Sequence, residues 1–345
     1  MTRFGKTGVL LVNLGTPDDP GRSSVYTYLK QFLLDPRVID YPWLPRNLLV
    51  RAIIAPFRSG SSSKLYKQLW TPEGSPLKVY GRKLEAGVRA QLGEDYVVEL
   101  AMRYQSPSIE SSVQKLIDAK VSDIIVLPLF PHYASASSGS VHEEIMRIFK
   151  KRGTIPNLRL INSFYDYEPL IDVFVENARK FDIDSYDHVL FSYHGVPKRH
   201  LLKSDEGCHC QKVDKCCETI SIDNQFCYSA QCYETTYQIA AKLGLSRDRY
   251  TVCFQSRLGG GWIEPFSDKV IEALAAKGAK RLLAFSPAFV SDCLETTIEI
   301  STEYQEEFEE WGGEKIDLVP SLNDNPKWIK GVADLIRMNT VGVPI

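Results

Sequence analysis

The sequence contains no apolar stretch long enough to cross a membrane. In its 345 residues, no hydrophobic run reaches the roughly 18 positions that a spanning helix requires. The short apolar run at residues 9–12 lacks the small-residue cleavage site of a signal peptide, so it predicts a buried strand instead. We therefore expect a soluble protein that stays in the cytoplasm.

The sequence also lacks an excess of either charge. The formal net charge is −2, which argues against a nucleic-acid-binding protein. Hydrophobic residues make up 44% and charged residues 24% of the chain, as in a typical globular protein. A chain of this length is long enough for two domains, or for one large one.

Short apolar runs of strand length recur in both halves of the chain, with helical periodicity between them, for example at residues 109–120. The runs lie at residues 9–12, 97–104 and 124–129, and again at 189–193, 250–254 and 281–285. Strands that alternate with helices predict an α/β fold built on parallel, doubly wound sheets.

The two halves also match in detail, which indicates two copies of one α/β unit. VLLVNLGTP at 9–17 matches VLFSYHGVP at 189–197, AMRYQS at 101–106 matches TVCFQS at 251–256, and VSDIIVLPLFP at 121–131 matches AKRLLAFSPAF at 279–289. We expect one Rossmann-like lobe at residues 1–170, a second at 171–320, and a final helix within 321–345 that packs back on the first lobe. Ligands of such sheets bind beyond the carboxyl ends of the strands, so we expect the site in an inter-lobe cleft.

His194 directly follows the predicted strand at 189–193 and precedes a glycine. A neutral imidazole at a strand end can accept a proton or bind a metal ion near neutral pH. The alternative is a structural histidine that only forms hydrogen bonds.

Three carboxylates follow the predicted strand at 281–285. If residues 292–299 form an α-helix, Asp292, Glu295 and Glu299 lie on one of its faces. Carboxylates stacked beside a cleft could attract a divalent cation or relay protons. The alternative is a solvated acidic face.

The apolar helical segment at residues 48–57 is accompanied by Arg46, Arg51 and Arg58. Such a surface suits a large, flat, acidic ligand or a membrane surface. The alternative is an ordinary core helix.

Six of the eight cysteines lie between Cys208 and Cys232. Because cytosolic thiols are kept reduced, this clustering predicts a metal site rather than disulfides. The paired C-x-x-C spacings of a zinc ribbon are absent; the pattern C-x5-C-C-x9-C is formed by Cys210, Cys216, Cys217 and Cys227. Four thiolates suit a 2Fe–2S cluster or zinc, and the alternative is a set of free thiols.

Seven segments, in order along nearly the whole chain, resemble the ferrochelatase family, whose members insert ferrous iron into a porphyrin to make haem. They are VNLGTP at 12–17, YKQLWTPEGSPL at 66–77, MRYQSP at 102–107, PLFPHYASASSGS at 128–140, SYHGVP at 192–197, FQSRLGGGWIEP at 254–265 and SPAFVSDCLETTIEI at 286–300. The resemblance implies a chelatase-like fold of two similar Rossmann-like lobes with the porphyrin between them.

The resemblance also implies roles for particular residues. His194 would accept the pyrrole protons or bind the incoming iron, and Glu295 would be its partner carboxylate. Asp292 and Glu299 would carry protons or metal along the helix face. The residues that match positions of the porphyrin pocket are Tyr66, Arg103, Tyr228, Trp262 and Phe289 as lining, Arg58 near the propionates, and Asn13 on the opposite wall.

The cysteine-rich segment at 206–232 departs from the simplest family pattern. It resembles an internal segment of some bacterial ferrochelatases that holds a 2Fe–2S cluster. The resemblance implies that the cluster ligands are Cys210, Cys216, Cys217 and Cys227, with Cys208 in reserve and Cys232 left out. Both redox sensing and simple cross-linking of the segment remain open as the role of the cluster.

The activity implied by the resemblance is insertion of Fe²⁺ into protoporphyrin IX with release of two protons, the last step of haem synthesis. Coproporphyrin stays open as the substrate, because it differs only at the ring edge. A cobalt or nickel chelatase would usually have more site histidines than His132 and His194, the strand-end histidines in comparable loops here.

A non-enzymatic alternative is a carrier of haem or iron that uses the same cleft. The partners we expect are a porphyrin and ferrous iron, and no nucleic acid. The apolar region at 41–57 is a candidate for peripheral contact with the inner membrane, or for the lip of the porphyrin pocket. The oligomeric state is left open.

Overall fold

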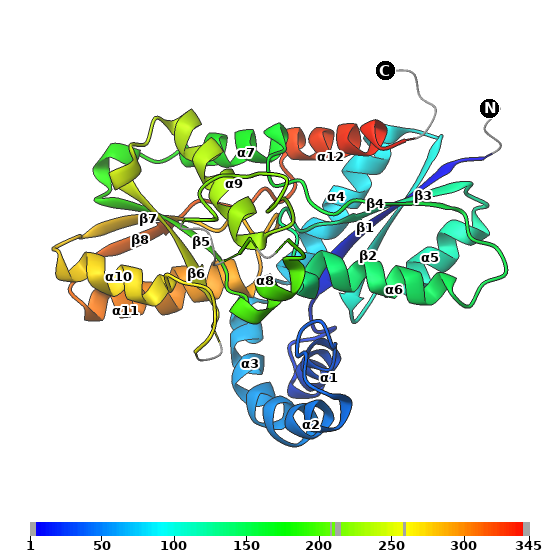
Figure 1. The fold of residues 1–345 in the computed structure, drawn as a ribbon, viewed down its shortest axis with the longest axis horizontal. Helices are drawn as coiled ribbons and strands as arrows, with labels where there is room; N and C mark the ends of the chain where they lie inside the picture. Colours follow the sequence, from blue (N-terminus) through cyan, green and yellow to red (C-terminus); the bar gives the residue numbers. More distant parts are fainter. Residues whose placement is uncertain (1–4, 208, 211–214, 258–259, 341–345) are drawn as a thin grey trace. The chain divides into compact units, whose positions relative to one another are not determined.

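The structure is a computed structural model that describes residues 5–207, 209–210, 215–257 and 260–340. It divides into two compact units. Unit 1 comprises Met1–Phe130, Ser135–Ser163 and Asn323–Ile345, and unit 2 comprises Pro131–Ala134 and Phe164–Leu322. Each unit contains one sheet with helices on both of its faces (Figure 1).

The sheet of unit 1 has four parallel strands in the order β2-β1-β3-β4. Its strands are β1 (Thr7–Gly15), β2 (Tyr96–Tyr104), β3 (Asp123–Pro128) and β4 (Asn157–Leu160). The central strand β1 is buried along almost its whole length. A strand covered on both faces needs apolar residues at successive positions, which explains the continuous apolar run at its centre.

Figure 1 shows α4 and α12 on one face of this sheet, and α5 and α6 on the other. The helical elements of unit 1 are α1 (Arg22–Leu33), α2 (Trp43–Leu48), η1 (Leu49–Ile54), α3 (Ala55–Leu69), α4 (Pro76–Leu92), α5 (Ile109–Asp118), η2 (Ser135–Gly139), α6 (Ser140–Phe149) and α12 (Pro326–Met338). The C-terminal helix α12 packs closely on α4. A Cβ atom added at Gly87 of α4 would lie only 2.8 Å from the side chain of Ile329 in α12. Gly87 therefore allows the two helices to approach.

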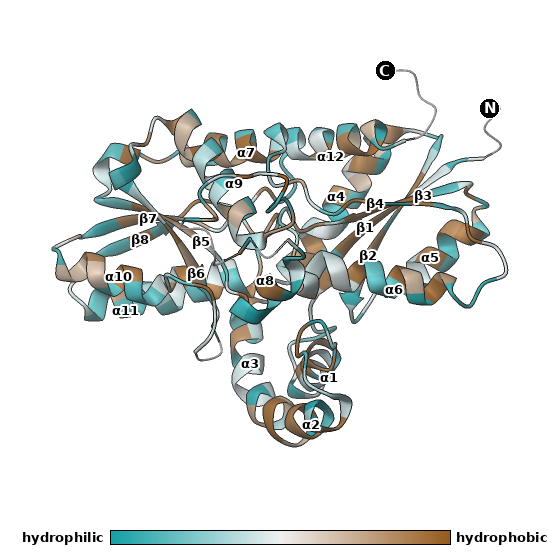
Figure 2. Ribbon diagram, in the orientation of Figure 1, coloured by the Kyte–Doolittle hydropathy of each residue, from teal (hydrophilic) through white to brown (hydrophobic). Residues whose placement is uncertain are grey.

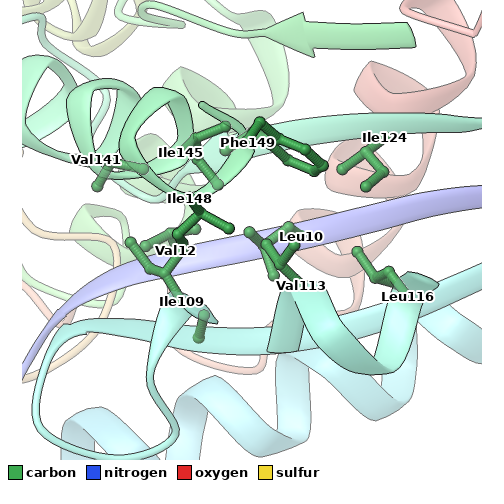
Figure 3. Packing of buried hydrophobic residues seen from close by; sticks show 12 residues of the cluster. Leu10, Val12, Ile109, Val113, Leu116, Ile124, Val141, Ile145, Ile148 and Phe149 are labelled. Carbon is green, nitrogen blue, oxygen red and sulfur yellow. The ribbon is translucent and has the colours of Figure 1, made fainter. Parts of the chain in front are cut away.

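Apolar side chains fill the space between the sheet and the second pair of helices. Figure 3 shows Leu10 and Val12 of β1 against Val113 of α5 and Ile145 of α6, and all four are completely buried. Helix α5 starts where the hydroxyl of Ser108 accepts a hydrogen bond from the Ser111 backbone N–H, a typical N-cap. The predicted helix at 109–120 is confirmed, with an end at Asp118.

The sheet of unit 2 repeats the same arrangement, with four parallel strands in the order β6-β5-β7-β8. The strands are β5 (His188–His194), β6 (Tyr250–Gln255), β7 (Arg281–Phe285) and β8 (Lys315–Leu318). The helical elements are α7 (Glu168–Ala178), η3 (Ile183–Ser185), α8 (Lys198–Ser204), α9 (Tyr228–Leu243), η4 (Arg247–Arg249), α10 (Ser267–Ala276), η5 (Glu295–Tyr304) and α11 (Gln305–Glu310). The shared strand order confirms the prediction of two similar α/β lobes.

The fourth strand of each sheet was not predicted from the sequence. β4 reads NLRL and β8 reads KIDL, and each alternates between apolar and polar residues over four positions. Each is paired on one side only, to β3 and β7 respectively. A short edge strand has polar residues on its exposed positions, so no apolar run of strand length marks it.

The segment 41–57 exposes its apolar side chains. Trp43, Leu44, Leu48 and Phe57 are between 66% and 79% exposed, and no residue of α2 is buried. Figure 2 shows this helical region as strongly hydrophobic. The alternative of an ordinary core helix is therefore wrong. No helix in the described ranges is long and apolar enough to span a membrane.

Candidate active site

His194 ends β5 and is half-buried, whereas the preceding residues of the strand lie in the core. Its Nδ1 lies 2.7 Å from the carbonyl oxygen of Gly195. A carbonyl oxygen can only accept, so Nδ1 must carry the hydrogen. In the neutral imidazole the lone pair then lies on Nε2, which is the nitrogen available for a proton or a metal ion.

The peptide group that joins His194 to Gly195 is held at both of its polar atoms. The Tyr228 hydroxyl donates to the His194 carbonyl oxygen at 2.8 Å, and the Gly195 N–H donates to the carbonyl oxygen of Gln255 at 2.8 Å. A Cβ atom at Gly195 would lie 2.8 Å from that same Gln255 oxygen. A glycine is therefore required where β5 turns away from the sheet.

Gln255, at the end of β6, connects His194 to the carboxylates, and the sequence did not single it out as a site residue. Its side chain is buried and donates to the backbone carbonyl of Glu295 at 2.8 Å and to the Glu299 carboxylate at 3.1 Å. Its side-chain oxygen accepts a hydrogen bond from Ser192 at 2.6 Å. The repeated FQS and YQS motifs at the two second strands were the available signal.

The helix that carries the carboxylates is a π-helix over Glu295–Tyr304 rather than the predicted α-helix over 292–299. Asp292 lies before this helix, and its Oδ1 accepts a hydrogen bond from the Ser321 N–H at 3.4 Å. The prediction that Asp292 shares a helix face with Glu295 and Glu299 is therefore wrong. Asp292 and Cys293 precede the first helical residue, Leu294, so Asp292 has no place on a helix face.

π-helical hydrogen bonds join residues five apart, so side chains four or five apart share one side. Glu295, Glu299 and Glu303 satisfy that spacing, and Glu303 was missed although the sequence repeats glutamate at every fourth position. Partial burial and the nearby carboxylates of Glu299 and Glu306 raise the pKa of Glu303. The three glutamates form an acidic row along one side of η5.

The Glu299 carboxylate is held by neutral donors. The Ser256 hydroxyl donates at 2.5 Å and the Tyr304 hydroxyl at 3.1 Å, in addition to Gln255. In the described part of the chain no lysine or arginine pairs with Glu295 or Glu299, and Arg257 pairs with Asp268 instead. The oxygen atoms of such a carboxylate are not occupied by an ion pair and suit a divalent cation as ligands.

Two aromatic residues of the predicted porphyrin pocket lie beside His194. The ring centroid of Phe289 is 6.3 Å from that of the imidazole, in an edge-on arrangement. The Trp262 ring lies against Gly195, where an added Cβ would be 3.2 Å from it. Both side chains are only partly buried, so they keep apolar surface next to His194.

His132, the other strand-end histidine, belongs to the core of unit 2. Its side chain is only 2% exposed, and its Nε2 lies 2.9 Å from the Thr235 hydroxyl. Burial lowers the pKa of His132 to about 3. An imidazole that stays neutral and buried cannot act as the base of an open site, which leaves His194 as the candidate.

The predicted porphyrin residues of unit 1 differ in exposure. Asn13 is 5% and Tyr66 7% exposed, and the Asn13 side chain accepts a hydrogen bond from the Leu14 N–H at 2.8 Å. Arg58 is exposed on α3. Arg58 is thus open to an external anion, whereas Asn13 and Tyr66 are largely buried.

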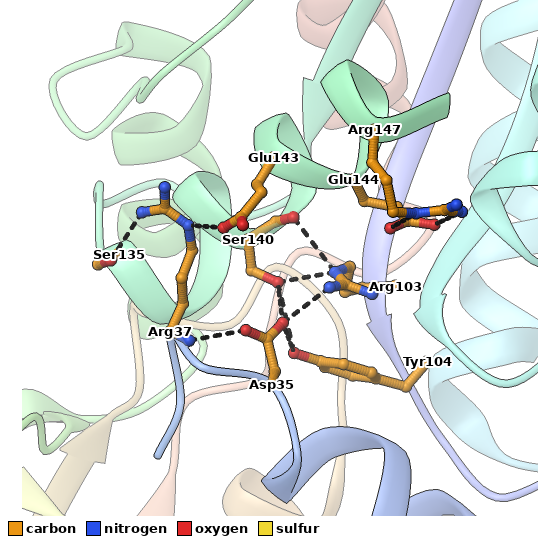
Figure 4. Close-up of polar contacts among 9 residues, drawn as sticks. All are labelled: Asp35, Arg37, Arg103, Tyr104, Ser135, Ser140, Glu143, Glu144 and Arg147. Atoms are coloured by element: carbon orange, nitrogen blue, oxygen red, sulfur yellow. Dashed lines mark hydrogen bonds and ion pairs between the residues drawn. The ribbon is translucent and has the colours of Figure 1, made fainter. Parts of the chain in front are cut away.

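Arg103 is fixed in a polar network around the buried carboxylate of Asp35 (Figure 4). Its Nη2 donates to Asp35 at 2.8 Å and its Nε to the Ser140 hydroxyl at 2.7 Å. Asp35 also accepts from the Tyr104 hydroxyl at 2.9 Å and from the Arg37 N–H at 2.7 Å. This network joins the end of α1 to β2 and to the start of α6.

The cysteines predicted to bind a metal gather at the start of α9. The Sγ atoms of Cys216 and Cys217 are 3.8 Å apart, the Cys217 thiol hydrogen-bonds to Cys227, and Cys210 contacts Cys216. Cys208 lies outside the described residues. Cys232 is completely buried further along α9.

The hydrogen bond from Cys217 lowers the pKa of Cys227 to about 6, while burial and the neighbouring Cys227 and Cys216 raise that of Cys210 to about 12. Cysteine sulfur is a soft donor, and four of them fit an iron–sulfur cluster or zinc in their chemistry. Within the described ranges, however, no three histidine, cysteine or carboxylate side chains already have the geometry of a metal site. The thiols are near one another without being placed as ligands.

A sequence model of the ferrochelatase family matches residues 6–340. This chain belongs to the ferrochelatase family. A ferrochelatase of Coxiella burnetii (strain Dugway 5J108-111) is 44% identical over 340 residues, which cover 96% of this chain and 93% of that protein. A ferrochelatase of Legionella pneumophila (strain Lens) is 40% identical over 333 residues, 96% of this chain and 99% of that protein.

Among solved structures, the chain is similar to SirB from Bacillus subtilis with Fe³⁺. The TM-score is 0.57 at 10% identity, over 97% of this chain and 96% of that one. A second match is the sirohydrochlorin chelatase SirB from Bacillus subtilis subspecies spizizenii in complex with cobalt, with a TM-score of 0.54 and 11% identity over 96% of this chain and 94% of that one. At such low identity the likeness confirms the chelatase fold alone.

Proposed function

We propose that this chain is a ferrochelatase that inserts Fe²⁺ into protoporphyrin IX and releases two protons, as the last step of haem synthesis. The observation that carries the proposal is the His194 imidazole, whose Nδ1–H is fixed on the Gly195 carbonyl. Nε2 is thereby left as the basic nitrogen, beside a row of carboxylates that lack a cation. Membership of the ferrochelatase family supports the same reading.

Iron insertion requires that two pyrrole N–H protons leave while a metal ion enters the ring. His194 would accept a proton through Nε2, since that nitrogen has the free lone pair. Glu295 and Glu299 would receive protons from the site or hold Fe²⁺ on its way in, because neither charge is neutralised by a basic residue. Gln255 would position these groups relative to one another, since it contacts the Gly195 N–H, the Glu295 backbone carbonyl and the Glu299 carboxylate.

A porphyrin needs apolar walls that grip its faces and cations for its acidic edge. Phe289 and Trp262 would contact the ring next to His194, and walls that favour a puckered ring would stabilise the transition state over the flat substrate. From unit 1, we assign Asn13 and Tyr66 to the ring and Arg58 to the propionates. Arg103 would act as a fixed positive charge, since Asp35 and Ser140 hold it in place.

The activity can be tested by an anaerobic assay of Fe²⁺ with protoporphyrin IX and, in parallel, with coproporphyrin. We expect haem formation with protoporphyrin at the higher kcat/KM. Faster turnover of coproporphyrin would move the assignment to the alternative substrate. Binding of both iron and porphyrin without haem formation would identify a carrier and reject the enzyme.

We also propose that the gathered thiols bind a 2Fe–2S cluster, with Cys210, Cys216, Cys217 and Cys227 as its ligands. The proximity of the thiols and their all-sulfur character support this assignment. A bound cluster would supply a one-electron redox centre and a cross-link within the segment. The anaerobically purified protein should be red-brown, with equal amounts of iron and acid-labile sulfide. A colourless protein with one zinc per chain would contradict the cluster.

A specific observation favours a lipid surface as an additional partner. The exposed apolar side chains of the 41–57 region adjoin the exposed Arg58, a combination that suits an anionic membrane surface. We expect Trp43→Ser combined with Phe57→Ser to abolish sedimentation with phosphatidylglycerol vesicles. Ile222→Ser is the matched control, because Ile222 is 79% exposed, as is Phe57. Equal sedimentation of all three proteins would reject this partner.

A further inference from the structure

Tyr228 connects two parts of unit 2 that have separate proposed roles. It is the first residue of α9, and its hydroxyl donates to the carbonyl oxygen of His194 at 2.8 Å. Cys227, the residue immediately before it, is the N-cap of the same helix and one of the four gathered cysteines. One side chain and one peptide bond therefore separate the cysteine segment from the end of β5.

The contact between Tyr228 and His194 leaves little room for rearrangement. The Tyr228 side chain is only 6% exposed, and its ring packs edge-on against His132 with centroids 6.0 Å apart. The other side of the contacted peptide is held by Gln255 through the Gly195 N–H. A shift of the Tyr228 backbone would consequently break the hydrogen bond or move the His194 carbonyl, because hydrogen bonds weaken steeply when they lengthen or bend.

On the cysteine side, the backbone is tied by Asn224. The Asn224 side chain donates to the Cys216 carbonyl at 2.8 Å, and the Cys227 N–H donates to the Asn224 carbonyl at 2.8 Å. Cys216 and Cys227 thus belong to one hydrogen-bonded loop. A change in how the thiols are bound reaches the start of α9 directly through this loop.

We propose that Tyr228 is a positioning residue that couples the state of the four cysteines to His194. This inference rests on the proposed function, which makes His194 the base and the cysteines the cluster ligands. Ligation of the thiols would restrain Cys227, and Tyr228 would then hold the His194–Gly195 peptide more tightly. Release of the thiols would free the start of α9 to move, and the peptide that orients the imidazole would then be held less tightly. Tyr228 itself remains outside the reacting atoms.

The test compares Tyr228→Phe, which removes only the hydroxyl, with Tyr233→Phe as a matched control. Tyr233 lies on the same helix, packs against Tyr237 and lies near Cys217, whose charge contributes to its raised pKa. The readout is the ¹⁵N chemical shift of the His194 imidazole in histidine-labelled protein, assigned by loss of the signal in His194→Ala. Each protein is measured as purified anaerobically and again after anaerobic removal of the cluster.

Cluster removal should move the His194 signal in the wild type and in Tyr233→Phe. In Tyr228→Phe the signal should already lie near the cluster-free position and should hardly move. Coupling between binding free energies is reciprocal, so Tyr228→Phe should also bind the cluster less tightly than the control. In a titration with an iron chelator, half of the visible absorption should be lost at a chelator concentration about two- to tenfold lower, the range expected for one hydrogen bond.

Three results would overturn the coupling: equal movement of the His194 signal in wild type and Tyr228→Phe, no movement in the wild type, or a wild-type protein that purifies without iron and sulfide. If Tyr228→Phe does not fold, Cys227→Ser replaces it, and an unshifted His194 signal in that variant also overturns the coupling. Haem formation in the assay is independent of these signals, so failure of the coupling and failure of the proposed activity are distinguishable.

Discussion

Asp35 of unit 1 and Glu299 of unit 2 are carboxylates that accept hydrogen bonds from residues at or just after the end of the second strand of their own sheet, and they are held in opposite ways. Asp35 accepts hydrogen bonds from Arg103, Tyr104, Ser140 and the Arg37 N–H, so its charge is fully compensated. Glu299 receives only neutral donors. The same α/β unit thus contains an ion-paired carboxylate in one copy and a carboxylate with only neutral donors in the other.

The two units also differ in the residue at the end of their first strand. In the matched segments at 9–17 and 189–197, Leu14 occupies the place of His194. At the two positions compared, unit 1 has a leucine and an ion-paired carboxylate where unit 2 has the imidazole and a carboxylate with neutral donors only. The duplicated sequence therefore forms the same α/β fold twice, while the proposed proton and metal chemistry depends on side chains of unit 2 alone.

The largest expected effect tests whether unit 2 alone carries the chemistry. His194→Ala should lower the rate of iron insertion about a thousandfold, within the range for loss of a general base, while protoporphyrin IX still binds. Leu14→Ala, at the matched position of unit 1, should change the rate less than threefold. The rates come from the anaerobic assay and binding from porphyrin fluorescence. Near-normal iron insertion by His194→Ala would contradict the proposal that the chemistry depends on unit 2.

The next effect tests the ion-paired carboxylate of unit 1. Asp35→Asn should lower the free energy of unfolding by about 3 kcal/mol, because it leaves the Arg103 guanidinium without its buried counter-charge. Urea unfolding followed by circular dichroism provides the measurement. Glu143→Gln is the control, since Glu143 forms a more exposed ion pair with Arg37, and exposed pairs contribute less than about 1 kcal/mol. An equal loss of unfolding free energy in Asp35→Asn and Glu143→Gln would show that the buried carboxylate contributes no more than the exposed one.

The same isosteric change in unit 2 should affect activity and not stability. Glu299→Gln should reduce kcat about tenfold, or about 1.4 kcal/mol, because it removes a charge proposed to take up protons or iron. The unfolding free energy should stay within about 0.5 kcal/mol of the wild type, since no cation loses its partner. A stability loss as large as that of Asp35→Asn would contradict the proposed contrast.

The last prediction is a pH-dependent effect and concerns the buried histidine of unit 2. The pKa of His132 is about 3 in the folded state, below its ordinary value in an unfolded chain. The unfolded state therefore binds the extra proton first, and stability is lost as the pH falls from about 6.5 toward 3, by up to about 1.4 kcal/mol per pH unit. His132→Asn should flatten this part of the stability profile, measured by urea unfolding between pH 7 and pH 5. An unchanged slope would reject the neutral, buried state of His132.

Much of the fold was predictable because buried parallel strands require continuous apolar runs. Three strands of each sheet were found in this way, and the matched segments predicted two copies of one α/β unit. The edge strands β4 and β8 were missed, since partial exposure mixes polar residues into four-residue segments. The helical periodicity of 48–57 could not distinguish a core helix from an exposed one, because the pattern does not say what covers an apolar face.

The candidate site was predictable only at positions where the motif itself contains the chemistry. His194 and Glu295 stand out as a strand-end imidazole and a carboxylate in a distinctive segment. The role of Gln255 and the row of glutamates on η5 required the structure, since π-helical geometry changes which side chains share a side. The prediction for Asp292 assumed an α-helix over residues 292–299. Residue spacing predicts which side chains share a face only when the type and bounds of the helix are known.

The sequence by itself determined the family, the duplicated α/β units, the strand-end position of His194 and the clustering of the cysteines, because motifs and apolar patterns are local properties of the chain. Only the tertiary structure decided that Asp35 pairs with an arginine while Glu299 has only neutral hydrogen-bond donors. It also decided that His132 is buried and that Tyr228 contacts the His194 carbonyl. These depend on contacts between residues about 34 to 105 positions apart. The charge state and orientation of a side chain are set by such neighbours, and sequence order alone does not identify them.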